Sequence, residues 1–131
     1  MIKNRLPIVV VEDNEMNQQL LRFQLKRIGF DEVVVLQNGE DAIDWLSKNE
    51  CLIVLADCQM PKMDGYEMTK RIRQEEKMTG RHLSIIAITA SAMDDDRARC
   101  FESGMDDYLS KPTQIATIQR ILSQWIPKDD E

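Results

Sequence analysis

The sequence has little histidine and cysteine, and it lacks long apolar runs. His82 is the only histidine, and Cys51, Cys58 and Cys100 form neither a Cys-x-x-Cys pair nor another metal-binding spacing. Free thiols in a reducing cytosol are therefore expected, and a disulfide framework is not. No apolar run approaches the length of a membrane span, and no signal-length apolar core follows the basic start of the chain.

Positive charge is also in short supply. Lysine and arginine number 17 against 23 aspartate and glutamate residues, which gives a formal net charge of -6. An acidic surface repels phosphate backbones, so we do not expect this chain to bind nucleic acid directly. Its 131 residues are the size of one domain and can bury a core. We expect a single domain over residues 1–131 with a core from about residue 6 to 126, located in the cytoplasm.

Short apolar runs alternate with segments of helical periodicity. Four runs are rich in β-branched residues and apolar on both faces, which is typical of strands buried between two helical layers. These runs, with a weaker fifth, are at residues 8–11, 33–36, 52–55, 85–88 and 107–110. Helices are expected from Gly65 onward and over residues 15–28, 39–47, 94–103 and 114–125. This order predicts a doubly wound α/β sheet with its ligand site beyond the carboxyl ends of the strands.

Capping residues set the expected helix ends. Asn14 and Asn38 are expected to cap the first two helices, Gly29 to end the first, and Pro127 to end the last. The first helix carries an apolar stripe that we expect to face the core, made of Leu21, Leu25 and Ile28 and widened by Met16, Leu20 and Phe23.

Chemically useful residues follow four of the five expected strands. Glu12-Asp13 follows the first, Asp57 the third, Thr89 the fourth and Lys111 the fifth. Three carboxylates at one edge repel one another and stay ionised only beside a cation, and oxygen ligands in an open site favour Mg²⁺. A lysine can pair with a phosphoryl oxygen, and a carboxylate can attack phosphorus to give an aspartyl phosphate. The set therefore suits Mg²⁺-assisted phosphoryl transfer.

Each of these residues taken alone has an ordinary structural explanation. An aspartate after a strand is usually a turn or cap residue, Lys-Pro is a turn, and Thr89 is a strand-end hydroxyl. Their conjunction at one sheet edge favours the phosphoryl chemistry over these explanations.

The chain resembles response-regulator receiver domains of two-component systems from about Leu6 to Trp125. The resemblance rests on Val-Val-Glu-Asp-Asn at 10–14, the block at 57–65, Ile-Thr-Ala at 88–90 and Tyr-Leu-Ser-Lys-Pro at 108–112. It implies a flavodoxin-like sheet of strand order 2-1-3-4-5 with five helices. The sequences of these motifs most resemble those of receiver domains in hybrid sensor histidine kinases. Such domains pass the phosphoryl group to a histidine phosphotransfer domain.

The resemblance implies a phosphoacceptor and a metal site. Asp57 would take the phosphoryl group from a phosphohistidine of a histidine kinase or a histidine phosphotransfer domain. Glu12, Asp13, Asp57 and the backbone carbonyl of Gln59 would hold Mg²⁺, directly or through water. The side chain of Gln59 would also affect how fast water attacks the acyl phosphate.

The resemblance further implies a switch. Lys111 would pair with the phosphoryl group, and its peptide bond to Pro112 would be cis. Thr89 would bond a phosphoryl oxygen, and Tyr108 would change rotamer when Thr89 moves. The face formed by the fourth helix, fifth strand and fifth helix would then change, while Ser91 would tune hydrolysis.

Several residues are expected to have structural roles only. His82 is expected in a loop rather than as a relay histidine, so the phosphodonor comes from another domain or protein or from a small molecule. Cys58 is expected to be a structural thiol, Asp64 a turn residue at a helix start, and Trp45 and Trp125 packing residues.

Three other functions remain as alternatives. A Mg²⁺-dependent phosphohydrolase with an aspartyl nucleophile usually has a second aspartate two residues later, where this chain has Gln59. A receiver-like module without phosphorylation is disfavoured because every core site residue is present, and a DNA-binding regulator because no effector domain follows Trp125. We expect a phosphoacceptor signalling domain rather than an enzyme. Such a domain catalyses only its own phosphorylation and dephosphorylation. It would lie in the cytoplasm, alone or as part of a membrane-anchored hybrid kinase.

Overall fold

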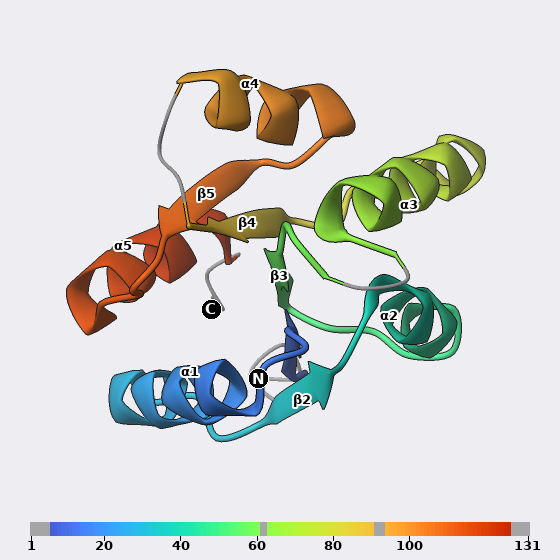
Figure 1. The fold of residues 1–131 in the computed structure, drawn as a ribbon. Helices are drawn as coiled ribbons and strands as arrows, with labels where there is room; N and C mark the ends of the chain where they lie inside the picture. Colours follow the sequence, from blue (N-terminus) through green and yellow to red (C-terminus); the bar gives the residue numbers. More distant parts are fainter. Residues whose placement is uncertain (1–5, 61–62, 91–93, 127–131) are drawn as a thin grey trace.

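The structure, a computed structural model, describes residues 6–60, 63–90 and 94–126 (Figure 1). Within these residues, strands and helices alternate as the sequence predicts. The strands are β1 (Ile8–Val11), β2 (Val33–Leu36), β3 (Ile53–Asp57), β4 (Ile85–Thr89) and β5 (Asp107–Ser110). The helices are α1 (Glu15–Ile28), α2 (Gly39–Leu46), α3 (Gly65–Thr79), α4 (Asp94–Ser103) and α5 (Ile115–Trp125). The expectations for Ser91 and Pro127 fall outside the described residues.

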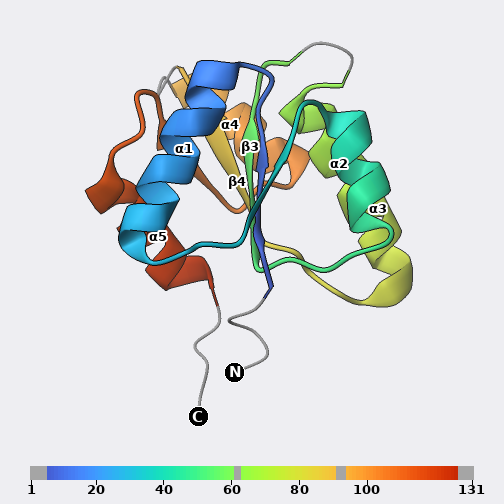
Figure 2. The same ribbon diagram turned by 90° about the horizontal axis from the view of Figure 1, so that it is seen from below.

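These strands form one parallel sheet in the order β2-β1-β3-β4-β5, which confirms the predicted flavodoxin-like arrangement. Helices α1 and α5 cover one face of the sheet, and α2, α3 and α4 cover the other (Figures 1 and 2). The register places Val11 of β1 beside Ala56 of β3, and Asp57 beside Ile88 of β4. Because parallel strands run in one direction, the residues that follow them meet at one edge.

The core has an apolar layer on each face of the sheet. Side chains alternate along β1, so Val9 and Val11 pack with the layer under α2, α3 and α4, whereas Ile8 and Val10 pack with the layer under α1 and α5. The central strands β1, β3 and β4 are fully buried, as expected. Strand β2 departs from this expectation and is only half-buried, because it lies at the edge of the sheet. Each fully buried Val, Leu or Ile side chain contributes about 1.5–3 kcal/mol, so the central strands make a rigid base for the edge.

The helix ends follow the predicted caps. Asn14 Oδ1 accepts the Asn17 N–H at 3.0 Å, and Asn38 Oδ1 accepts the Asp41 N–H at 2.9 Å. Gly29 ends α1 with a φ of 120°, a conformation that a side chain would disfavour. Helix boundaries therefore agree with the predictions to within one residue where caps are present.

The apolar stripe predicted on α1 is wrong in its width. Met16, Leu20 and Phe23 are 80%, 40% and 55% exposed, whereas Leu21 and Leu25 are buried. With 3.6 residues per turn, the three exposed residues lie about 130° around the helix axis from the row that faces the sheet. No described element packs over that side of α1, so its apolar residues are open to solvent.

The expectations for the cysteine and tryptophan side chains are confirmed. The three cysteines are free. Trp45 and Trp125 pack against the core, and Trp125 Nε1 donates to Asp107 Oδ2 at 3.0 Å. None of the helices in the described ranges is long and apolar enough to cross a membrane.

Candidate functional site

Three carboxylates meet at the carboxyl edge of the sheet. Glu12 and Asp13 follow β1, and Asp57 is the last residue of the neighbouring strand β3. Each offers an oxygen that lies within 4.8 Å of the others, and no other described acidic, histidine or cysteine side chains form such a group. Glu12 and Asp57 are buried, whereas Asp13 is exposed. The predicted clustering of these residues is confirmed.

Glu12 is the most constrained of the three carboxylates, with an exposed fraction of 1%. Its Oε2 accepts the Asn14 N–H at 3.1 Å, whereas Oε1 is buried without a hydrogen-bond partner among the described residues. Burial raises the pKa of Glu12, the Asn14 N–H opposes this, and the charge of Asp57 adds to the rise. A buried carboxylate oxygen that lacks a donor is suited to a cation, so the residues present fit a divalent metal ion with oxygen ligands.

Lys111 supplies the positive charge of the site. Its Nζ lies 2.9 Å from Asp57 Oδ2 and 3.6 Å from Glu12 Oε1. Burial lowers the pKa of Lys111, but the hydrogen bond and the attraction to Asp57 outweigh it, so the pKa is raised overall. Lys111 therefore stays protonated between two carboxylates. Its bond to Pro112 is cis, as expected.

Asp57 is held on both sides. Its Oδ2 accepts from Lys111, and its Oδ1 accepts the Gln59 N–H at 3.0 Å. Gly65, the first residue of α3, packs so closely that a Cβ there would lie 2.5 Å from the Asp57 carbonyl oxygen. The start of α3 therefore rests on the backbone of Asp57. The role of the Gln59 carbonyl as a metal ligand stays a prediction.

Thr89 and Tyr108, the two residues of the predicted switch, lie on the neighbouring strands β4 and β5. Thr89 is the buried last residue of β4 and is paired with Ser110 of β5. Tyr108 is half-buried on β5, and the guanidinium carbon of Arg97 on α4 lies 5.0 Å from its ring centroid. This distance allows a cation–π contact between α4 and β5. The movement of Thr89 and Tyr108 stays a prediction.

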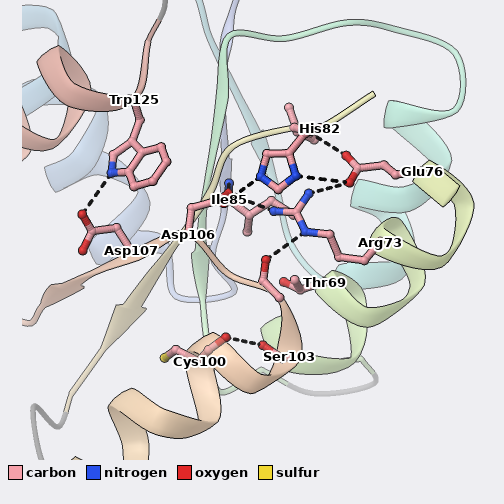
Figure 3. A network of polar contacts seen from close by, with 12 residues as sticks. Thr69, Arg73, Glu76, His82, Ile85, Cys100, Ser103, Asp106, Asp107 and Trp125 are labelled. Atoms are coloured by element: carbon pink, nitrogen blue, oxygen red, sulfur yellow. Dashed lines mark hydrogen bonds and ion pairs between the residues drawn. The ribbon is translucent and has the colours of Figure 1, made fainter. Parts of the chain in front are cut away.

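His82 lies in the loop before β4, as expected, and so at the end of the sheet opposite the carboxylates. Its Nε2 lies 2.7 Å from Asp106 Oδ1, and Asp106 Oδ2 accepts the N–H of Ile85, the first residue of β4 (Figure 3). Arg73 joins the same network, with Nη2 2.9 Å from Asp106 Oδ2 and Nη1 2.7 Å from Glu76 Oε1. The network is therefore at the amino end of the sheet, opposite the carboxylates.

Two contacts near the site were not predicted. The Sγ atoms of Cys58 and Cys100 lie 3.8 Å apart in the core, which agrees with the structural role expected for Cys58. Gln24 on α1 is buried and bonds to Thr113 in the loop that carries Lys111. A single glutamine within a helix gives no signal of such a contact, because its partner is distant in the sequence.

Asp64 caps α3 by accepting the Glu67 N–H, as predicted.

Comparison with known proteins identifies relatives of the chain. A family model for the response regulator receiver domain matches residues 8–123. The hybrid signal transduction protein dokA of Dictyostelium discoideum is 42% identical over 94% of this chain and 7% of that protein. The sensor histidine kinase RcsC of Escherichia coli (strain K12) is 44% identical over 88% of this chain and 12% of that protein. The chain thus spans a small part of the length of these relatives.

Solved structures of receiver domains are also similar to this chain. The receiver domain of sensor histidine kinase PA1611 from Pseudomonas aeruginosa PAO1, with a magnesium ion coordinated in its active site cleft, has a TM-score of 0.82 and 39% identity and covers 92% of this chain and 96% of that chain. A co-crystal structure of the Saccharomyces cerevisiae histidine phosphotransfer protein Ypd1 and the receiver domain of its downstream response regulator Ssk1 gives a TM-score of 0.84 at 29% identity, covering 92% of this chain and 88% of that chain.

The family match, the shared strand order and the similarity to hybrid sensor kinases agree with the motifs at the strand ends. The chain belongs to the response regulator receiver domain family of two-component signal transduction.

Proposed function

We propose that this chain accepts a phosphoryl group on Asp57 from a phosphohistidine, with Mg²⁺, as one step of a His–Asp phosphorelay. The carrying observation is the arrangement around Asp57: Lys111 Nζ lies 2.9 Å from its Oδ2, and Glu12 and Asp13 complete a carboxylate cluster beside it. The relatives support the proposal, because they include sensor histidine kinases and a receiver domain with a magnesium ion.

The metal site of this proposal consists of the carboxylates of Glu12, Asp13 and Asp57 with the backbone carbonyl of Gln59. A bound Mg²⁺ would neutralise charge on the transferring phosphoryl group. The Oε1 of Glu12 supports this assignment, because it is buried and accepts no hydrogen bond from the described residues, and the Lys111 ammonium lies 3.6 Å away.

The chain's own residues carry the transfer. An oxygen of the Asp57 carboxylate forms a bond to phosphorus as the bond from phosphorus to the donor histidine nitrogen breaks, and that nitrogen keeps the electron pair. Lys111 moves its contact from Asp57 to a phosphoryl oxygen, and the Thr89 hydroxyl donates a hydrogen bond to another phosphoryl oxygen. Most of the catalysis is positioning and charge neutralisation, which the rigid sheet edge provides.

The proposed output is a change of surface. The new charge draws Thr89 and Lys111 toward the phosphoryl group, Tyr108 turns inward, and the face of α4, β5 and α5 changes. The group then passes to a histidine phosphotransfer domain. The complex of Ypd1 with the receiver domain of Ssk1, its downstream response regulator, supports a histidine phosphotransfer protein as a partner, there on the upstream side of the receiver. We place the chain in the cytoplasm, alone or within a membrane-anchored hybrid kinase, and assign it no turnover of external substrates.

The test is intact-mass spectrometry after incubation with acetyl phosphate, with and without Mg²⁺. We expect one phosphoryl adduct that requires Mg²⁺ and is lost in Asp57→Asn, because an amide oxygen is a poor nucleophile toward phosphorus. Asp44→Asn is the matched control, since this aspartate is exposed on α2 and should leave the adduct unchanged.

An adduct that persists in Asp57→Asn would show that the acceptor is another residue. Steady release of phosphate from many phosphate esters, without a stable adduct, would instead support a phosphohydrolase.

A further inference from the structure

A buried pair of polar residues, Gln24 and Thr113, links α1 to the loop between β5 and α5. Gln24 Nε2 donates to the Thr113 carbonyl oxygen at 2.8 Å, and Thr113 Oγ1 donates to Gln24 Oε1 at 2.8 Å. The two residues are 6% and 9% exposed. The carbonyl can only accept, so it fixes the orientation of the amide. Because either residue alone would leave buried polar groups without partners, the pair holds one arrangement.

The loop that Thr113 anchors is the loop that carries Lys111. On its near side, the Lys111 N–H donates to the Thr89 carbonyl oxygen at 2.8 Å, which attaches the loop to β4. On its far side, Thr113 attaches the loop to α1 through Gln24. A lysine side chain is long and flexible, so the position of its ammonium depends on how firmly the backbone beneath it is held.

Helix α1 also anchors Glu12, one of the two carboxylates that face Lys111. The helix starts directly after Glu12 and Asp13, and Gln18 Nε2 donates to the Glu12 carbonyl oxygen at 2.6 Å. One helix therefore holds the acidic pair at its start and the Lys111 loop at Gln24, in its third turn. Helix α1 therefore connects Glu12 to the backbone that carries Lys111, whereas Asp57 is held separately at the end of β3.

We propose that Gln24 and Thr113 are positioning residues for phosphoryl transfer, which fix the Lys111 ammonium against Asp57. The effect on transfer rests on the proposed function, but the position of Lys111 can be measured without any phosphorylation. Neither residue contacts the carboxylate cluster; both act through Lys111. A purely structural pair would change the stability of the fold without moving the ammonium.

The first experiment measures acylation of lysine amines in the folded protein, by peptide mass spectrometry, in wild type and Gln24→Met. Methionine keeps a similar length but removes both hydrogen bonds. We expect Lys111 to react several-fold faster in the variant, because its ammonium leaves Asp57 more often. Lys48, exposed on the surface beyond α2, is the internal reference and should not change. Equal Lys111 rates in the two proteins would overturn the proposal.

The second experiment measures phosphorylation by acetyl phosphate at saturating Mg²⁺. We expect several-fold slower transfer in Gln24→Met, unchanged Mg²⁺ affinity, and no further slowing when Gln24→Met is added to Lys111→Ala. If the slowing in the double variant equals the product of the slowing in the two single variants, Gln24 does not act through Lys111. If the wild type gains no phosphoryl group, the proposed function fails, whereas the acylation result still decides the positioning role.

Thr113→Val provides a second variant in case Gln24→Met does not fold. It removes the hydroxyl but keeps the carbonyl that Gln24 Nε2 contacts, and Thr113→Ser restores the hydroxyl. We expect faster acylation of Lys111 in Thr113→Val and wild-type acylation in Thr113→Ser. A folded Thr113→Val protein with wild-type acylation of Lys111 would refute the proposal.

Discussion

At the scale of single residues, Arg73 shows how the contribution of an ion pair to stability depends on its exposure to solvent. Its guanidinium contacts Glu76 and Asp106 at a site where the three side chains are 11–16% exposed, and its Nε also donates to the Gly104 carbonyl oxygen at 2.8 Å (Figure 3). Arg71, two residues earlier on α3, pairs with Glu67 in solvent. The same type of residue on one helix therefore makes a desolvated network and a surface pair.

We expect Arg73→Met to destabilise the fold by about 3 kcal/mol, because it leaves two poorly solvated carboxylates without their cation. Arg71→Met, the matched control, should cost less than about 1 kcal/mol. Urea unfolding measures both. Equal small losses in the two variants would show that the remaining contacts of Asp106, with His82 Nε2 and the Ile85 N–H, are sufficient to hold its carboxylate.

The residues of the candidate site could be predicted because each of them lies at the carboxyl end of a strand or just after it. Strand runs are visible in the sequence, and parallel strands end at the same edge, so Glu12, Asp57, Thr89 and Lys111 had to converge. Gln24 could not be predicted, because its role depends on Thr113, 89 positions away in the chain. The contact between Cys58 and Cys100 was missed for the same reason.

At the scale of elements, local signals predicted the ends of helices but not which sides of them are covered. Asn14 and Gly29 mark the ends of α1 through their own backbone and side-chain geometry. Which side of α1 is covered depends instead on where α5 packs, and that is set by tertiary structure. Met16, Leu20 and Phe23 therefore form an exposed apolar row that the sequence analysis placed in the core.

This row adjoins the site. Leu20 lines a cavity of about 260 Å³ together with Glu12 and Lys111. A protein that brings a phosphohistidine to Asp57 would cover this part of α1, whereas acetyl phosphate would not.

We expect Phe23→Ser to slow transfer from a phosphorylated histidine phosphotransfer protein about tenfold, with an unchanged rate from acetyl phosphate, because interface aromatics often contribute more than 1 kcal/mol. Met78→Ser on α3 is the control, since this apolar residue is also exposed, at 89% against 55% for Phe23, but lies at the end of α3 away from the site. The readout is the ratio of the two transfer rates. A ratio unchanged in Phe23→Ser would place the donor on another surface.

At the scale of the whole molecule, the acidic net charge and the carboxylate cluster both lower the stability of the fold. The net charge of -6 and the buried Glu12 beside Asp57 both oppose the compact state in the absence of a cation. A metal ion that binds only the folded protein stabilises it in proportion to the logarithm of its concentration.

We therefore expect Mg²⁺ at about 100 times its dissociation constant to stabilise the fold by about 2.7 kcal/mol. Thermal unfolding in Mg²⁺, in chelator, and in sodium chloride of equal ionic strength measures this. Asp13→Asn should lose most of the gain, since it removes an exposed charged ligand without opening the core. If sodium chloride gives the same gain, the effect is general screening of the acidic surface rather than site binding.

The packing of Gly65 against the Asp57 carbonyl has a consequence for the direction in which a signal can leave the site. On that side the start of α3 has no free space toward β3, and a similar close approach joins Gly39 of α2 to Met63, where a Cβ would lie 2.8 Å from the carbonyl oxygen. If Asp57 accepts a phosphoryl group as proposed, these two close backbone contacts leave little room for movement on the side of α2 and α3. We therefore expect any displacement to be directed to the other side of the site, toward Thr89 and the side chains of β5 and α4.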